Sequence, residues 1–145
     1  MESFKLKSNF FDPQRGRLVA ATPEEERRQS LLQQLIHQLS FPKQLIAVEK
    51  QIGELPHLKG RSGIPKRRVD ILCFAGGIHP LLLIECKEGD VTAADEQQVL
   101  GYNHYIQAPF VAVAGKDGAR LIFPQRVPFI PSYPQLMERF SAPRS

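Results

Sequence analysis

The sequence lacks the features that mark membrane, secreted and disulfide-rich proteins. No apolar run approaches the roughly 20 residues of a membrane-spanning helix, and the N-terminus has no signal-peptide pattern. The two cysteines, Cys73 and Cys86, lie inside apolar runs, which favours reduced, buried thiols over a disulfide framework. We therefore expect a soluble, cytoplasmic protein that has no membrane as a partner.

Motifs for nucleotide-driven, zinc and acyl-transfer chemistry are missing as well. The segment Ala114-Gly115-Lys116-Asp117 does not fit the pattern of a phosphate-binding P-loop, so the sequence predicts no ATP site in this chain. No zinc-ligand cluster and no acyl-transfer triad is visible. Any hydrolytic chemistry must therefore use other residues and proceed without ATP bound here.

The composition is that of a single globular domain. With 145 residues, 42% of them hydrophobic and 23% charged, the chain can bury a sizeable core. The net charge of +4 and the isoelectric point near 9.3 favour a polyanionic partner, although only mildly.

The pattern along the chain predicts one domain over residues 1–145. Residues 1–21 are expected to form an N-terminal arm or hairpin, because the turn-forming stretch 12–16 separates two apolar stretches. Residues 22–123 form the predicted core, and residues 124–145 a proline-rich C-terminal tail with a short helix around 133–140. Thr22, Pro23 and Glu25 are typical of a helix start with a capping box.

Hydrophobic periodicity predicts an α/β fold with the order αβββαββ. We expect a mixed sheet of about five strands, with the first helix on one side and the second helix across from it. The predicted helices and strands are residues 22–39 (helix), 45–52, 68–74 and 81–87 (strands), 92–107 (helix), and 110–114 and 121–123 (strands).

Charged residues interrupt two of the predicted buried strands. Asp70 lies in one, and Glu85 and Lys87 lie in the next, where alternate side chains share a face. Two carboxylates with the backbone carbonyl of Cys86 can hold Mg²⁺ or Mn²⁺ when a substrate supplies phosphate oxygens. Lys87 can then orient a water or stabilise charge on the phosphate. An alternative is a buried salt bridge of Glu85 with Lys87 or with Arg67.

The spacing and the surrounding motifs resemble a nuclease family. An acid followed about fifteen positions later by Glu-x-Lys is the pattern of the PD-(D/E)xK nuclease superfamily, here with Val69-Asp70 in place of Pro-Asp. The segments PEEERRQ, RRVDI, IECKEG and QVLGYN stand in the order found in the N-terminal nuclease domain of type I restriction enzyme R subunits, and the preceding FFDPQRGRLVAAT resembles small stand-alone members. The resemblance spans residues 10–118 and implies a restriction-endonuclease-like fold.

The resemblance also implies an activity and further site residues. It implies a divalent-metal-dependent endonuclease that hydrolyses DNA, with Glu25 approaching the metal and with Gln98 and Tyr102 bordering the active site. The alternative is a catalytically weak or inactive nuclease-like module that binds nucleic acid or a partner protein. DNA is the expected partner, and a homodimer or a partner protein remains open.

A basic loop directly precedes Asp70 and is a candidate nucleic-acid contact. Its positive charges could neutralise phosphates that flank the scissile one, and Arg68 is the strongest candidate because it is nearest to the acid. A solvated loop without a binding role is the alternative. The candidate contacts are Lys59, Arg61, Lys66, Arg67 and Arg68.

Overall fold

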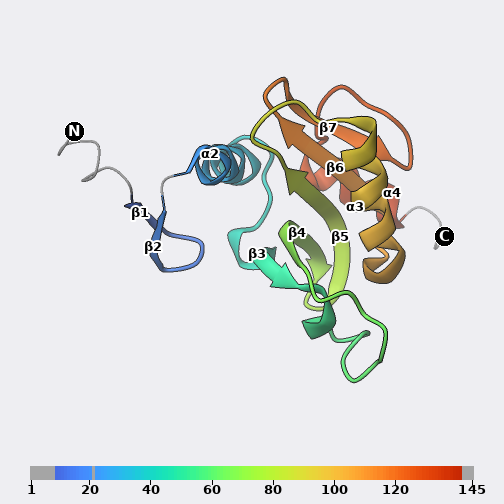
Figure 1. Ribbon diagram of the computed structural model, residues 1–145. Coiled ribbons are helices and arrows are strands. Elements are labelled where there is room, and N and C mark those ends of the chain that lie inside the picture. The colour runs from blue at the N-terminus through green and yellow to red at the C-terminus, as the bar shows by residue number, and fades with distance from the viewer. Residues whose placement is uncertain (1–8, 21, 142–145) are drawn as a thin grey trace.

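The computed structural model describes residues 9–20 and 22–141, and it has the predicted α/β architecture (Figure 1). The described residues form an N-terminal hairpin, a five-stranded sheet and three helices. After the hairpin, the elements follow the predicted order αβββαββ, and a last helix comes after them. The elements are β1 (Asn9–Asp12), β2 (Arg17–Ala20), α2 (Pro23–His37), η1 (Lys43–Leu45), β3 (Ile46–Gln51), η2 (Ile52–Glu54), β4 (Arg68–Gly76), β5 (His79–Cys86), α3 (Ala93–Ile106), β6 (Phe110–Gly115), β7 (Gly118–Phe123) and α4 (Tyr133–Ser141).

The sheet is mixed, as predicted. Its strands lie in the order β3-β4-β5-β6-β7, and neighbouring strands are antiparallel except for the parallel pair β5 and β6. A tight turn joins β4 to β5, whereas helix α3 makes the crossover that a parallel pair requires. The central strand β5 is buried from Leu81 to Cys86, because both faces of the sheet are covered.

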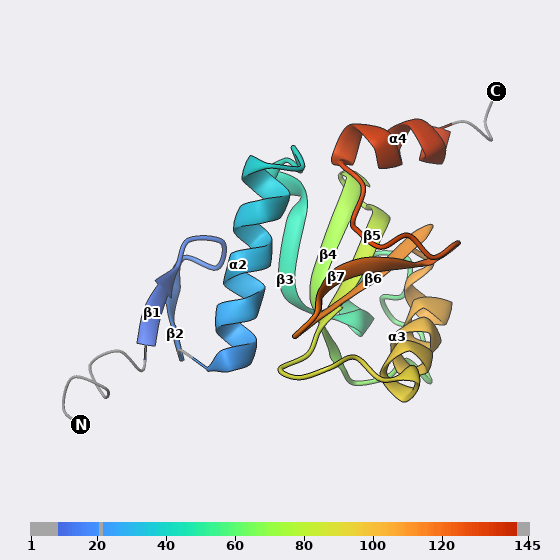
Figure 2. The same cartoon turned by 90° about the horizontal axis from the view of Figure 1, so that it is seen from above.

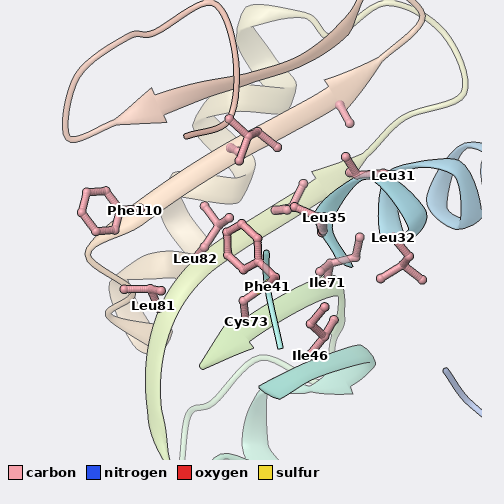
Figure 3. Packing of buried hydrophobic residues seen from close by; sticks show 14 of the residues in the cluster. Leu31, Leu32, Leu35, Phe41, Ile46, Ile71, Cys73, Leu81, Leu82 and Phe110 are labelled. Atoms are coloured by element: carbon pink, nitrogen blue, oxygen red, sulfur yellow. The ribbon is translucent and has the colours of Figure 1, made fainter. Parts of the chain in front are cut away.

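The two helices predicted on opposite faces of the sheet are found there. Apolar residues of α2 and α4 pack on one face around Ile71, Cys73 and Ile84, and Figure 3 shows this packing from close by. Residues of α3 and of the segment after β3 pack on the other face around Leu72 and Leu83. The side chains of Leu31, Leu32 and Leu35 recur at helical spacing and are all buried, which is why α2 docks on the sheet.

The starts of α2 and α3 are capped differently. Thr22 Oγ1 accepts a hydrogen bond from the Glu25 amide at 3.0 Å, so α2 has the threonine half of the expected capping box. The Glu25 carboxylate is instead engaged by arginines described below. The reciprocal capping box is found on α3, where Thr92 Oγ1 accepts from the Asp95 amide and Asp95 accepts from the Thr92 amide.

The hairpin lies on the outer side of α2, and its turn reaches the start of β3 (Figures 1 and 2). Gln14 Nε2 donates to the carbonyls of Lys43 and Ile46 at 2.9 and 2.8 Å. The predicted hairpin is thus present over its described part. Residues 1–8 and 21 of the predicted arm lie outside the described residues.

The proline-rich C-terminal segment is packed on the core. Leu136 of α4 is fully buried, and the rings of Tyr133 and Phe41 meet edge to face with centroids 5.5 Å apart. The predicted short helix is therefore found as α4, while residues 142–145 lie outside the described residues. Over the described residues, none of the helices is long and apolar enough to cross a membrane.

Candidate active site

The register of β4 and β5 brings Asp70 and Glu85 together. Ile71 pairs with Ile84, so Asp70 lies directly across from Glu85 at the ends of these two strands. The Asp70 amide donates to Glu85 Oε1 at 3.2 Å, and Asp70 Oδ2 accepts from the Cys86 amide at 2.7 Å. The predicted convergence of the two acids is found, and each carboxylate is fixed by a backbone donor.

Burial and the neighbouring charge make Glu85 a difficult acid to ionise. Its side chain is almost fully buried, and burial followed by the Asp70 carboxylate raises the pKa of Glu85 to about 8. Two adjacent carboxylates in a partly buried place repel each other. A cation between them would relieve this repulsion.

Lys87 follows β5 directly and pairs with the start of α3. Its ammonium lies 3.5 Å from Asp95 Oδ1, and its amide donates to the carbonyl of Ala114 at 2.8 Å. Of the two salt bridges considered for Glu85, the one with Arg67 is present, with Nη2 and Oε2 3.6 Å apart. The Lys87 ammonium is therefore paired with Asp95 at the start of α3.

Arg28 is the central residue that was not predicted. It is 3% exposed, and its guanidinium contacts Asp70 Oδ1 at 2.9 Å, Glu25 Oε1 at 2.6 Å and Glu49 Oε1 at 3.1 Å. The sequence position of Arg28 indicates that its side chain faces the sheet. Arg28 precedes Leu31, Leu32 and Leu35 by three, four and seven residues, so a charged residue continues the apolar stripe of α2.

Glu25 lies one turn before Arg28 on α2 and is buried. Its Oε1 contacts Arg15 at 2.5 Å as well as Arg28, and its Oε2 accepts from Gln29 at 3.2 Å. The link from Glu25 to Asp70 therefore runs through the Arg28 guanidinium. A role for Glu25 at the metal stays a prediction.

Glu49 of β3 adds a further acid beside the site. The register of β3 and β4 pairs Val48 with Ile71 and Lys50 with Val69, so Glu49 stands opposite Asp70. Its backbone has a left-handed φ of 55°, and its carboxylate contacts Arg15, Arg28 and Arg68. The sequence feature that could have identified Glu49 is an acid within the predicted strand 45–52.

The two α3 residues of the predicted site, Tyr102 and Gln98, differ in burial. Tyr102 is half-buried, and the Arg67 guanidinium lies 5.2 Å from its ring centroid. Because Arg67 also contacts Glu85, Tyr102 is linked to the acids through this arginine. Gln98 is exposed one turn earlier on the same helix. Roles for both residues in catalysis stay predictions.

The basic loop divides into an outer and an inner part. All five basic residues are exposed, and Arg67 and Arg68 also contact the acids Glu85 and Glu49. The expectation that Arg68 is the strongest phosphate contact stays a prediction. Arg67 contacts Glu85 at 3.6 Å, and Arg68 lies 3.8 Å from Glu49. The two arginines reach different acids because successive side chains of an extended chain point to opposite sides.

The charge balance of the described site fits one divalent cation. Ion pairs and the Asp70–Glu85 hydrogen bond join six carboxylates to four arginines, which leaves two negative charges when every group is ionised. The carboxylates are those of Asp12, Glu24, Glu25, Glu49, Asp70 and Glu85, and the arginines are Arg15, Arg28, Arg67 and Arg68.

The donor set also limits how such an ion is held. Within residues 9–20 and 22–141, no group of three or more His, Cys, Asp or Glu side chains is arranged to hold a metal ion. Mg²⁺ and Mn²⁺ accept one or two protein carboxylates when water and phosphate oxygens complete their shell. Asp70 and Glu85 with the Cys86 carbonyl therefore fit such an ion, with the remaining ligands coming from outside the protein.

Comparison with known proteins identifies the family. The family model described as type I restriction enzyme R protein N terminus (HSDR_N) matches residues 23–126, which include all of the acids and arginines above except those of the hairpin. A search of curated proteins found no match. The match covers well over half of the chain, and it spans the sheet from β3 to β7 together with α2 and α3. The chain therefore belongs to the family of type I restriction enzyme R protein N termini.

Proposed function

We propose that this protein is a divalent-metal-dependent endonuclease that hydrolyses DNA phosphodiester bonds. The observation that carries the proposal is the contact between the buried Glu85 and the partly buried Asp70 in a member of a restriction enzyme family, with Lys87 two residues after Glu85. A buried acid that is costly to ionise and that contacts a second acid is typical of a catalytic site rather than of a stabilising one.

Asp70, Glu85 and the backbone carbonyl of Cys86 would hold the cation, which we expect to be Mg²⁺ or Mn²⁺. When bound, such an ion activates water as a nucleophile and neutralises charge on the phosphate. The protein prepares for it by fixing both carboxylates. The amides of Asp70 and Cys86 each donate to one of the acids, so little reorganisation is needed.

Lys87 supplies positive charge where the phosphate becomes more negative. Its amide is held by Ala114 and its ammonium by Asp95, so the side chain is positioned from both ends. Preorganised charge of this kind contributes strongly to catalysis, because it costs no reorganisation at the moment of reaction. Asp95 is a positioning residue in this arrangement.

Substrate binding uses the basic loop and the adjacent surface of α3. Lys59, Arg61 and Lys66 are exposed and would contact phosphates away from the scissile bond. Arg67 connects this loop to the acids through Glu85 and rests on Tyr102. Phosphates next to the scissile one would therefore meet Arg67 first.

Cleavage assays with defined variants test this function. Supercoiled DNA incubated with Mg²⁺ or Mn²⁺ should be nicked by the wild type, and Glu85→Gln or Lys87→Met should slow nicking by about 100-fold or more. Glu138→Gln on the exposed face of α4 is a matched control that should cleave normally. An RNA substrate run in parallel tests the choice of nucleic acid. Activity that survives both site variants would place the chemistry elsewhere.

The second candidate function is a nuclease-like module that binds nucleic acid or a partner and cuts poorly or not at all. One contact favours it, because Asp70 Oδ1 already has the Arg28 guanidinium at 2.9 Å, and a guanidinium competes with a metal ion for a carboxylate. DNA binding that needs no metal, with no cleavage under Mg²⁺ or Mn²⁺, would favour this second function.

A further inference from the structure

We propose that Arg28 is a positioning residue that aims Asp70 and at the same time weakens the affinity of the site for a divalent cation. This inference rests on the proposed function, because it concerns the same acids. Arg28 Nη2 lies 2.9 Å from Asp70 Oδ1, while the Cys86 amide holds the other oxygen, Asp70 Oδ2, at 2.7 Å. The carboxylate is thereby fixed at both oxygens.

Arg28 acts through Asp70 rather than on the substrate. It is 3% exposed, which leaves almost no guanidinium surface for a nucleic acid to contact. Its terminal nitrogens serve acids from three elements, with Glu24 and Glu25 on α2, Glu49 on β3 and Asp70 on β4. Arginine stays charged at every working pH, so this is a permanent cation within the acid cluster.

The charge and the geometry of Arg28 have opposite effects on the reaction. A divalent cation held by Asp70 must sit close to the guanidinium, and like charges at such distances repel strongly when partly buried. Removal of the charge should therefore tighten metal binding. The same removal frees Asp70 Oδ1, and a loosely held carboxylate places the cation less accurately against the scissile phosphate.

The Nε of Arg28 shows which atoms hold the guanidinium. It is buried and has no hydrogen-bond partner among the described residues, so the guanidinium is held by its terminal nitrogens alone. Further contacts to Glu25 and Glu49 keep Arg28 in place beside Asp70. The arginine can thus remain buried when the metal binds.

Metal binding and cleavage measured on the same variants test the proposal. Binding of Mn²⁺ to the full chain without DNA is followed by electron paramagnetic resonance, and cleavage by single-turnover assays at saturating Mn²⁺. For Arg28→Gln we expect Mn²⁺ binding about tenfold tighter and cleavage at least about tenfold slower. For Arg28→Lys, which keeps the charge but loses the planar fork, we expect affinity within about twofold of the wild type and slower cleavage.

The control is Arg120→Gln, which breaks an arginine–carboxylate pair with Glu96 at 2.9 Å, away from the acids. It should change stability but neither metal affinity nor cleavage. Weaker or unchanged Mn²⁺ affinity in a folded Arg28→Gln variant would overturn the inference while leaving the proposed function intact. If Arg28→Gln does not fold, the lysine variant decides, and cleavage at the wild-type rate overturns the inference. A wild type that binds no Mn²⁺ overturns the proposed function and this inference together.

Discussion

The backbone amide of Asp70 donates a hydrogen bond to the carboxylate of Glu85, the acid across from it on β5, at 3.2 Å. The contact joins main chain to side chain, so it does not depend on the Asp70 side chain. Substitutions that keep the shape of either acid should therefore preserve the local fold, and their effects on cleavage can be interpreted as chemistry.

Asp95 holds the ammonium group of Lys87, and its removal should separate catalysis from binding. In Asp95→Asn we expect single-turnover cleavage to slow about tenfold, because Lys87 Nζ loses the partner that lies 3.5 Å away. The affinity for DNA should change little. Asp117→Asn, in the exposed turn between β6 and β7, is the control. Equal cleavage by Asp95→Asn and the wild type would show that Lys87 needs no positioning.

Tyr102 supports Arg67 with the face of its ring. Tyr102→Phe keeps this face and should bind DNA as the wild type does, whereas Tyr102→Leu should raise KM by about two- to fivefold. The turnover at saturation should be similar in both variants. Steady-state cleavage at several DNA concentrations separates the two constants, and a turnover defect in Tyr102→Phe would point to a role for the hydroxyl group instead.

The exposed part of the basic loop should contribute to binding and not to chemistry. When Lys59, Arg61 and Lys66 are all replaced with alanine, the slope of log affinity against log salt should fall by about 0.9 for each lost phosphate contact. Cleavage at saturating DNA should be nearly unchanged, because the lost interactions are equal in the ground and transition states. An unchanged salt slope would mean that the DNA path lies elsewhere.

The sequence predicted much of the fold because its signals are local. The alternation and apolar runs of β4 and β5, the stripe of α2 and the Thr22 cap each act within a few residues. The convergence of Asp70 and Glu85 was also predictable, because a tight turn between two strands fixes which residues face each other. The residues that surround this acid pair were harder to predict.

The missed residues belong to contacts between distant segments. Arg28 reaches Asp70 across 42 positions, and Arg120 and Arg126 reach Glu96 across 24 and 30 positions. Such pairs depend on how α2 and α3 dock on the sheet, which periodicity does not specify. Glu49 was missed for a different reason, because its left-handed backbone departs from the strand geometry that the sequence predicted.

Glu96 on α3 should make the protein less stable in acid. Hydrogen bonds from Arg126 and then Arg120, which outweigh burial, lower the pKa of Glu96 below its usual value of 4.5. A lowered folded-state pKa gives stability that is present above pH 4.5 and is lost as the pH falls through the folded pKa. Between about pH 5 and 3, the Tm of Glu96→Gln should therefore fall less than that of the wild type. The exposed variant Glu138→Gln should follow the wild type, and an identical Tm profile for Glu96→Gln would contradict the prediction.

Gly115 lies where β6 meets the loop that follows Lys87, and no side chain fits there. A Cβ on Gly115 would lie 2.8 Å from the Gly89 carbonyl oxygen and 2.8 Å from Val91 Cγ2. Gly115→Ala should lower the free energy of unfolding by about 1–3 kcal/mol and slow cleavage, because the displaced loop begins next to Lys87. Gly101→Ala on α3 has open space around it and should be neutral or slightly stabilising. Denaturant unfolding measures both variants, and a neutral Gly115→Ala would show that the loop can shift freely.

The tight turn between β4 and β5 has a consequence for how the molecule folds. Asp70 and Glu85 are fifteen residues apart. Contacts with such a short sequence separation form early in folding, so we expect this pair to meet when the hairpin closes. If α2 docks after the hairpin has closed, the hairpin brings two like charges together in the absence of Arg28, and their repulsion opposes closure. Docking of α2 then supplies the compensating charge. We therefore expect Arg28 to speed the late steps of folding. The Asp70–Glu85 pair and helix α2 would then become stable together.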